Sequence, residues 1–487
     1  MMKLLIEHAL IVTMNERDEV IEDGSLAIDG NRLQYVGPAS GCPREDRDRI
    51  VDGSRFIAIP GLIDAHNHSP ANIFRGLMPA RPLEIWRAYW RAALRACGDD
   101  MFYVSALLGG MEMLKTGCTT TMDHFFGNQA SRYTGAGEAI RAMRDLGLRH
   151  VVALTVTDRP YESTVPMDAP REETSAEVSR MTGAETKGTR AWLDEIEAFI
   201  DELHDPGGLT TCCPGPSAVQ RCTDDLLQGV AAISERRGVP LHIHLAETRS
   251  QSLMGPKLYG TTLLKHLDDL GVVKPNLSTA HSLWIEPEDV EIIVERGATP
   301  VHNPASNLRL GSGLAPIPAF LAAGGRVAVG ADGACSNDSQ NMFDAMRLAA
   351  LIHNTRDHDY RHWITARQAL SMTTRWGARA FGLDCGVLEP GRLADVVLLN
   401  RDTPAFTPLN DVVTQLVFCE NGSSVDTVLV NGEMVVEGGR LTKMDETEVL
   451  AEVNRLYEPL RPAIRKEMED AAVMEPSLAE MYFRVFE

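Results

Sequence analysis

The sequence predicts an α/β protein: a (β/α)8 TIM-like barrel with a small β-sandwich domain formed by the N- and C-terminal segments. Between residues 58 and 384, strand-like apolar segments alternate with helical segments eight times. Residues 1–57 and 385–441 instead contain short alternating strands and tight turns. Eight β-then-α units favour a parallel barrel over a doubly wound sheet, and the β-rich ends favour one shared sandwich.

The elements follow in order along the chain. The first β-rich segment, 1–57, has a hairpin turn at Asp29-Gly30-Asn31, and the second, 385–441, has one at Asn431-Gly432. Segment 159–192 is polar and predicts a surface insertion, and the periodic tail 442–487 predicts a helical extension. The eight predicted barrel strands lie within 56–68, 118–125, 149–158, 209–216, 239–247, 276–284, 298–304 and 326–333.

Composition excludes several classes of partner. The 487 residues carry a net charge of −21 and no basic run, so neither nucleic acid nor an anionic membrane is an expected partner. No apolar segment approaches the length of a membrane helix. The nine cysteines are scattered without a CxxC pair, which favours free thiols in a reducing cytoplasm. We therefore expect a cytoplasmic protein that acts on a small molecule.

Polar side chains gather at the ends of the predicted strands. The carboxyl ends of parallel barrel strands converge on one face, where active sites lie. These side chains are therefore expected to meet although the chain separates them widely. They are His66 and His68 on strand one, His242, His244 and Glu247 on strand five, His281 on strand six, His302 on strand seven and Asp332 on strand eight.

The spacing of the histidines predicts a metal site. Positions i and i+2 of a strand share a face, so His66 and His68 both point into the barrel. With His244 and Asp332 they would form a nitrogen and oxygen site that leaves room for water, as in catalytic zinc sites. A divalent metal lowers the pKa of bound water to about 7, and Glu247 could shuttle the proton.

Each of these residues also has a simpler interpretation. A single HxH pair occurs by chance, Asp332 in "GADG" could be a turn residue or a helix cap, and Glu247 could be solvated. His242 is interpreted as structural or as a support for a ligand. The joint pattern on strands one, five, six and eight favours the metal site. No role is assigned to His8, His150, His204, His266, His353, His358 or His362.

At this point the chain resembles the amidohydrolase superfamily. More narrowly, it is similar to the branch that contains triazine hydrolases and the S-adenosylhomocysteine, guanine and cytosine deaminases. The similarity covers nearly the whole chain. It is carried by "PGLIDAHNH", "LHIHLAET", "TAHSLW", "VHNPASNLRLGSGLAPI", "VGADGACSND" and "GVLEPGRLADVVLLN".

The resemblance implies roles for individual residues. His66, His68, His244 and Asp332 would bind one divalent metal per subunit, zinc or sometimes iron. Glu247 would shuttle protons, His281 would hold the water or the substrate, and Asp332 would also act as the base. Strand four, "LTTCCPGP", has no lysine to bridge a second metal, which favours a mononuclear site. Relatives of this kind imply a homodimer or a higher homo-oligomer.

The reaction that the sequence favours is deamination of an aromatic nitrogen heterocycle of the purine, pterin, pyrimidine or triazine type. An amine leaving group needs a proton, which Glu247 can supply, whereas chloride does not. The alternative is a xenobiotic hydrolase that cleaves a C–Cl, C–N-alkyl or urea bond. A third interpretation is a non-catalytic barrel that binds a metal or ligand.

The substrate pocket is predicted with less detail. Trp86, Trp90, His124 and Phe126 could stack on a flat ring, although aromatic residues at helical spacing are more often core. The remaining candidates follow strand seven: His302 ends it, and Asn307 and Arg309 could contact polar substrate groups, with a loop-stabilising role equally open for Asn307.

Overall fold

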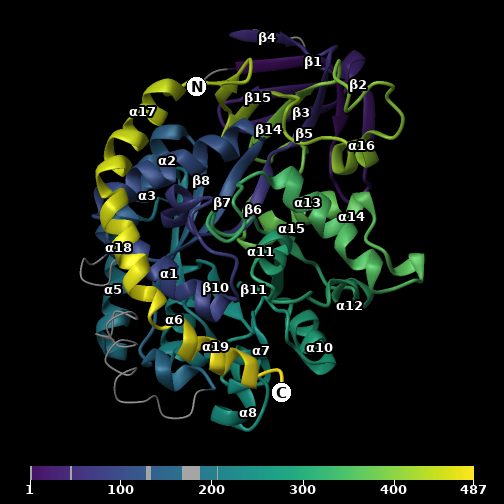
Figure 1. Ribbon diagram of the computed structural model, residues 1–487. Helices are drawn as coiled ribbons and strands as arrows, with labels where there is room; N and C mark the ends of the chain where they lie inside the picture. The colour runs from purple at the N-terminus through teal and green to yellow at the C-terminus, as the bar shows by residue number, and fades with distance from the viewer. Residues whose placement is uncertain (1–2, 44–46, 128–132, 167–186, 206) are drawn as a thin grey trace.

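The computed structural model describes residues 3–43, 47–127, 133–166, 187–205 and 207–487. Strands from both ends of the chain form a sheet at one end of the molecule, and a mixed α/β body lies beside it (Figure 1). Most of the predicted surface insertion at 159–192 falls outside the described residues, because 167–186 are not among them.

The end sheet has nine strands in the order β17-β16-β15-β14-β5-β1-β2-β3, with β4 also paired to β1. β5 joins the two ends of the chain, since it pairs with β1 on one side and with β14 on the other. Alternate side chains such as Leu4, Ile6, Val396 and Leu398 are buried together in one apolar cluster. The strands are β1 Lys3–Val12, β2 Val20–Asp29, β3 Arg32–Pro38, β4 Arg49–Asp52, β5 Phe56–Pro60, β14 Val396–Asn400, β15 Val425–Val430, β16 Glu433–Glu437 and β17 Arg440–Leu441.

The body contains two parallel four-stranded sheets, β6-β7-β8-β9 and β10-β11-β12-β13. A parallel bridge between Ala218 and His244 connects the chain after β9 to β10. On the other side, the Asp332 amide donates to the His66 carbonyl at 2.7 Å, which connects the chain after β13 to β6. The strands are β6 Leu62–Asn67, β7 Cys118–Phe125, β8 Arg149–Val156, β9 Thr210–Pro216, β10 Leu241–Leu245, β11 Leu277–His281, β12 Thr299–His302 and β13 Ala328–Val329.

The predicted first barrel strand, 56–68, is two strands in the structure. β5 belongs to the nine-stranded sheet and β6 to a parallel sheet, with Gly61 between them. A Cβ at Gly61 would lie 2.0 Å from Oγ1 of Thr119, so the Thr119 side chain packs against the Gly61 backbone more closely than a larger residue allows. The continuous apolar run hides this break, because both strands are buried.

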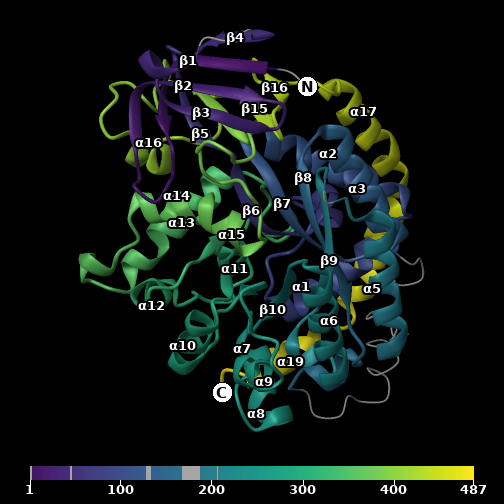
Figure 2. The ribbon, with the colours of Figure 1, turned by 180° about the vertical axis from the view of Figure 1, so that it is seen from behind.

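Helices follow the parallel strands and cover them (Figure 2). The last three, α17 to α19, run along one side of the body from the nine-stranded sheet to the far end (Figure 1), where Met474 and Leu478 pack against Ile85 of α1. The helices are α1 Leu83–Arg95, α2 Asp100–Lys115, α3 Thr134–Leu146, α5 Thr189–Leu203, α6 Asp224–Arg237, α7 Arg249–Ser252, α8 Met254–Tyr259, α9 Leu263–Asp269, α10 Pro287–Arg296, α11 Pro304–Arg309, α12 Ile317–Ala322, α13 Met342–Leu351, α14 Ala366–Met372, α15 Arg375–Ala380, α16 Val412–Phe418, α17 Glu446–Tyr457, α18 Arg461–Ala472 and α19 Glu475–Arg484.

Among the described residues, no helix is both long enough and apolar enough to span a bilayer.

Candidate active site

The backbone turns sharply where the parallel strands end. Ala246, His281, Ser282 and Asp332 have positive φ angles of 43°, 72°, 50° and 65°, in the left-handed region that side chains other than glycine rarely enter. Each such residue costs on the order of 1–3 kcal/mol, and this kind of strain is concentrated at functional sites. The turns follow β10, β11 and β13 and direct side chains into a common space.

Four side chains in this space form a compact set of possible metal ligands: His66, His68, His244 and Asp332. His68 Nε2 lies 3.4 Å from His244 Nε2 and 3.5 Å from Asp332 Oδ1, and His66 Nε2 lies 3.9 Å from that same oxygen. A tetrahedral zinc ion with bonds of about 2.0 Å holds neighbouring ligand atoms about 3.3 Å apart. The set therefore has nearly the spacing of a metal site, and small movements would complete it.

Hydrogen bonds orient the three imidazoles for this purpose. His68 Nδ1 lies 2.7 Å from the His124 carbonyl, and His244 Nδ1 lies 2.7 Å from the Ser217 carbonyl. A carbonyl only accepts, so Nδ1 carries the proton and Nε2 keeps its lone pair for a metal. His66 Nδ1 instead faces His242 Nε2 at 2.8 Å, and its own Nε2 is buried without a hydrogen-bond partner among the described residues. His242 therefore contacts a candidate ligand directly.

Burial favours the neutral form of His66, His242 and His244. Desolvation lowers the pKa of His66 and His244 well below the ordinary value, and the neighbouring histidines add to the effect. The pKa of His242 falls to about 3 for the same reasons. Neutral imidazole is the form that binds a metal, so the site is prepared for a cation near pH 7.

Glu247 and His281 face each other beside the ligand set. Glu247 Oε2 lies 3.7 Å from His281 Nε2, and both residues are buried. Burial, followed by the nearby carboxylates of Asp332 and Glu84, raises the pKa of Glu247 well above the ordinary range. Asn307 Oδ1 lies 3.0 Å from His281 Nδ1, and the side-chain nitrogen of Asn303 lies 3.2 Å from the same atom, so two amides hold the His281 ring from behind.

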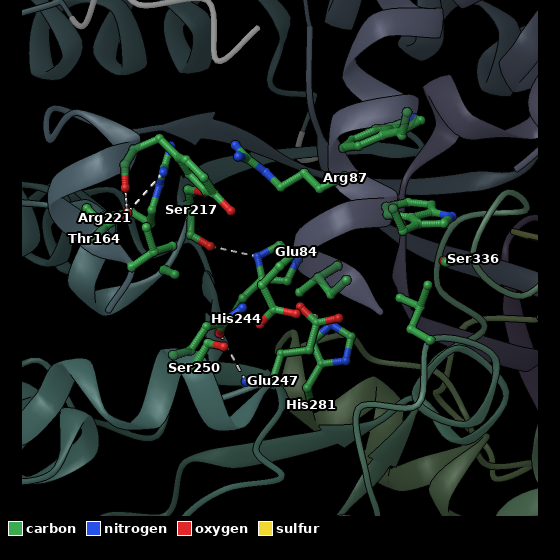
Figure 3. A pocket seen from close by; sticks show the side chains of 18 of the residues that line it. Glu84, Arg87, Thr164, Ser217, Arg221, His244, Glu247, Ser250, His281 and Ser336 are labelled. Carbon is green, nitrogen blue, oxygen red and sulfur yellow. Dashed lines mark hydrogen bonds and ion pairs between the residues drawn. The ribbon is translucent and has the colours of Figure 1, made fainter. Parts of the chain in front are cut away.

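A pocket of about 820 Å³, counted to its solvent mouth, opens onto these groups. Figure 3 shows Glu247, His281 and His244 along one part of it. Trp86, Trp90 and Phe126, three of the predicted stacking residues, line its wall. The rings of Trp86 and Trp90 stack with centroids 5.6 Å apart, and the Trp86 indole N–H donates to the Cys335 carbonyl at 3.2 Å. These aromatic faces suit a flat heterocycle.

The other predicted substrate residues lie behind the pocket wall. His124 stacks on His244 with centroids 4.5 Å apart, and Asn307 contacts His281. His302 is fully buried with its Nε2 3.3 Å from that of His353. Arg309 donates to Asp338 at 3.1 Å and to the Met78 carbonyl at 3.1 Å, so it ties two loops together. His124 also forms a possible metal group with His66 and His244.

Several residues that line the pocket are not among those predicted from the sequence. Glu84 and Arg87 lie on the same face of α1 as Trp90, and their helical spacing with it was the available signal. Glu84 is buried and accepts a hydrogen bond from Thr248 at 2.6 Å. No local pattern marks Arg221, which reaches the pocket from a short 3₁₀ turn, Val219–Arg221.

Comparison with known proteins identifies relatives along most of the chain. The model of the amidohydrolase family matches residues 57–435. The chain is 31% identical over 432 residues to the 5'-deoxyadenosine deaminase of Methanothermobacter thermautotrophicus, covering 88% of this chain and 93% of that protein. It is 32% identical to the 5-methylthioadenosine/S-adenosylhomocysteine deaminase of Pelotomaculum thermopropionicum, covering 93% and 98%.

Solved structures resemble the fold closely. Atrazine chlorohydrolase from Arthrobacter aurescens, complexed with zinc, aligns with a TM-score of 0.84 at 27% identity, covering 93% of this chain and 99% of that one. An adenosine deaminase from Xanthomonas campestris with bound zinc aligns with a TM-score of 0.81 at 26% identity, covering 95% and 99%. Both kinds of enzyme therefore share this arrangement of elements.

Proposed function

Because the chain belongs to the amidohydrolase family, we propose that it is a metal-dependent deaminase of an aromatic nitrogen heterocycle, with adenosine-type purines as its substrate class. The observation that carries the proposal is the buried pair Glu247 and His281 beside a cluster of side chains that could hold a metal ion. The deaminases among the relatives support the choice of a purine.

We assign one divalent metal, zinc, to His66, His68, His244 and Asp332. The distances between their ligand atoms are close to those of a tetrahedral site. His66 Nε2, buried without a hydrogen-bond partner among the described residues, would bind the metal. The zinc in the solved relatives supports this choice. When bound, such a metal supplies Lewis acidity and lowers the pKa of its bound water toward neutral pH, which makes that water a better nucleophile once it loses a proton.

The protein's own groups then manage the protons. The buried carboxyl of Glu247 holds a proton that it can give to a ring nitrogen. His281, held at Nδ1 by Asn307 and Asn303, turns Nε2 toward Glu247 and would orient the attacking water. Asp332 takes a proton from that water and returns it to Glu247, which passes it to the departing ammonia. The hydroxyl proton of the adduct then restores the Glu247 carboxyl. The sum is addition of water at the ring carbon and loss of ammonia.

The surroundings of the proton-transfer groups suit a flat substrate. Trp86, Trp90 and Phe126 would contact the ring faces and exclude water. His302 and Arg309 would act indirectly, by packing and by holding loops, and Asn307 by fixing His281. His124 would support the metal set from the side of His244.

The proposal extends to the architecture. The two parallel sheets would close into one eight-stranded barrel, supported by the contacts of Ala218 with His244 and of Asp332 with His66, and the nine-stranded sheet would fold into a sandwich. The nine free cysteines support a cytoplasmic location. We also propose a homo-oligomer, a dimer or larger, which light scattering can measure.

The test is release of ammonia by the zinc-loaded enzyme from a panel of adenosine derivatives, with pterins, pyrimidines and triazines for comparison. We expect turnover of an adenosine derivative. Ammonia from none of these compounds, with zinc bound, would contradict deamination. Release of chloride or alkylamine from triazines would instead support the xenobiotic hydrolase, the alternative favoured by the similarity to atrazine chlorohydrolase.

A further inference from the structure

Three arginines lie together at the part of the pocket away from Glu247 and His281. Arg87 and Arg91 come from one face of α1, and Arg221 comes from the 3₁₀ turn. Arg87 and Arg221 line the active-site pocket, and a second hollow of about 580 Å³ continues from it past Arg91. Figure 3 shows Arg87 and Arg221 on one side and Glu247 and His281 on the other.

The charges of these arginines have no carboxylate counterpart in the part of the chain that the structure describes. Arg221 is 8% exposed, and its guanidinium donates to the Thr164 hydroxyl at 3.1 Å. Arg87 and Arg221 both lie over the ring of Tyr161, at 4.4 and 4.8 Å from its centroid. No ion pair joins Arg87, Arg91 or Arg221 to a described acid, although the chain has more acidic than basic residues.

Such a cluster is unfavourable by itself. Buried cations are normally paired, and here like charges face one another. Burial, followed by the charge of Arg87, lowers the pKa of both Arg91 and Arg221 to about 9. Lys187, on the rim of the second hollow, is already paired with Glu195 at 2.5 Å. The arginines are therefore the cations that remain for a ligand.

The cluster is also held in place. The Arg221 carbonyl accepts from the Thr157 hydroxyl at 2.7 Å and from the Arg159 amide at 3.2 Å, which fixes the 3₁₀ turn. Arg87 and Arg91 are one turn apart on a helix of 13 residues. Guanidinium groups carried by a fixed backbone can bind carboxylate or phosphate through paired hydrogen bonds.

We propose that Arg87, Arg91 and Arg221 bind an oxyanion, a carboxylate or phosphate, carried by the substrate at the end remote from its amino group. This inference rests on the proposed function, because the heterocycle must occupy the part of the pocket near Glu247. It narrows the substrate class to adenosine-type compounds whose sugar carries an anionic substituent. The aromatic wall holds the ring, and the arginines select the tail.

The experiment compares kcat/KM of the zinc-loaded enzyme for adenosine, for adenosine 5'-carboxylate and for adenosine 5'-phosphate. We expect kcat/KM for the better of the two anionic substrates to exceed kcat/KM for adenosine. We expect Arg87→Met, Arg91→Met and Arg221→Met each to lower this anionic-to-neutral ratio about 10-fold to 100-fold, mainly through KM. Arg95→Met is the matched control, because Arg95 lies one turn further on α1 and pairs with Glu467 at 2.9 Å.

The two anionic substrates distinguish carboxylate from phosphate. Arg221 is buried, so the Arg221→Met variant could misfold. Arg87 and Arg91 are more exposed, and their variants keep the test valid in that case. A wild-type preference for adenosine over both anions, or a ratio unchanged in the Arg87 and Arg91 variants, would overturn the proposal.

A binding measurement separates this proposal from the deaminase assignment. Calorimetry with inosine 5'-carboxylate, inosine 5'-phosphate and inosine needs no turnover. Weaker binding of an anionic compound to the arginine variants, without any ammonia release by the wild type, would refute deamination and keep the anion site. Ammonia release by the wild type, with no effect of the variants on binding or on kcat/KM, would support deamination and refute the anion site.

Discussion

Replacing Glu247 by glutamine tests the proposed proton shuttle directly. The substitution keeps the size and shape of a side chain that is 5% exposed, but it removes the transferable proton. Glu247 lies beside the ligand set without belonging to it, so zinc binding should persist. General acid–base groups contribute about 10²–10⁴-fold to rate, and we expect kcat for deamination to fall by that factor with little change in KM.

The assay is steady-state ammonia release, with zinc per chain measured on the same samples. Glu235→Gln is the control, because Glu235 is exposed and pairs with Lys274 on the surface. A Glu247→Gln enzyme that holds one zinc and keeps kcat within about 3-fold of the wild type would refute the shuttle.

The same variant has a stability signature in the metal-free protein. Burial raises the pKa of Glu247, so the folded state prefers the protonated form. The stability this gives is present below the unfolded pKa of about 4.3 and is lost as pH rises toward the folded pKa. The metal-free glutamine variant should therefore melt at a higher temperature than metal-free wild type at pH 8. The difference should shrink toward pH 4, and equal melting temperatures at pH 8 would count against the raised pKa.

Three further substitutions test the ligand set and the frame around it. His68→Ala removes one ligand, so zinc per chain and ammonia release should fall together; full zinc content would exclude His68 as a ligand. His242→Phe removes the 2.8 Å contact to His66 and should lower zinc affinity about 10-fold to 100-fold, measured by competition with a chelator; unchanged affinity would contradict its supporting role. Asp395→Ala leaves the buried guanidinium of Arg149, now 3.0 Å from the carboxylate, without its partner. It should lower the free energy of unfolding in urea by about 3–5 kcal/mol, whereas a loss below about 1 kcal/mol would match only an exposed pair.

The close approach of the candidate ligands was the most predictable part of the site, for a simple geometric reason. A strand alternates with a period of two, so "HNH" and "HIH" fix which imidazoles share a face without knowledge of the rest of the fold. Parallel topology then brings the strand ends together. The amidohydrolase resemblance, confirmed by the family match over 57–435, rests on the same segments.

The predictions were less complete where distant elements decide the environment. Nothing local to His302 shows that His353 lies 3.3 Å away, and nothing near Arg309 shows that it meets Asp338. Arg221 follows an ordinary loop sequence, and its position depends on hydrogen bonds from residues 157 and 159. Local periodicity carries no information about such contacts.

The arrangement of the ligand set also links metal binding to the way the two parallel sheets meet. His68 Nε2 and His244 Nε2 face each other at 3.4 Å, an arrangement that a cation between them would stabilise. Asp332, a candidate ligand, is held at a strained φ of 65° by the hydrogen bond from its amide to His66 and by the Gln340 side chain, which donates to its carbonyl at 2.7 Å. The contacts that bring β13 to β6 are thus the contacts that position two ligands. A metal bound by these residues stabilises the junction of the sheets, and the junction in turn holds the ligands at the distance the metal requires.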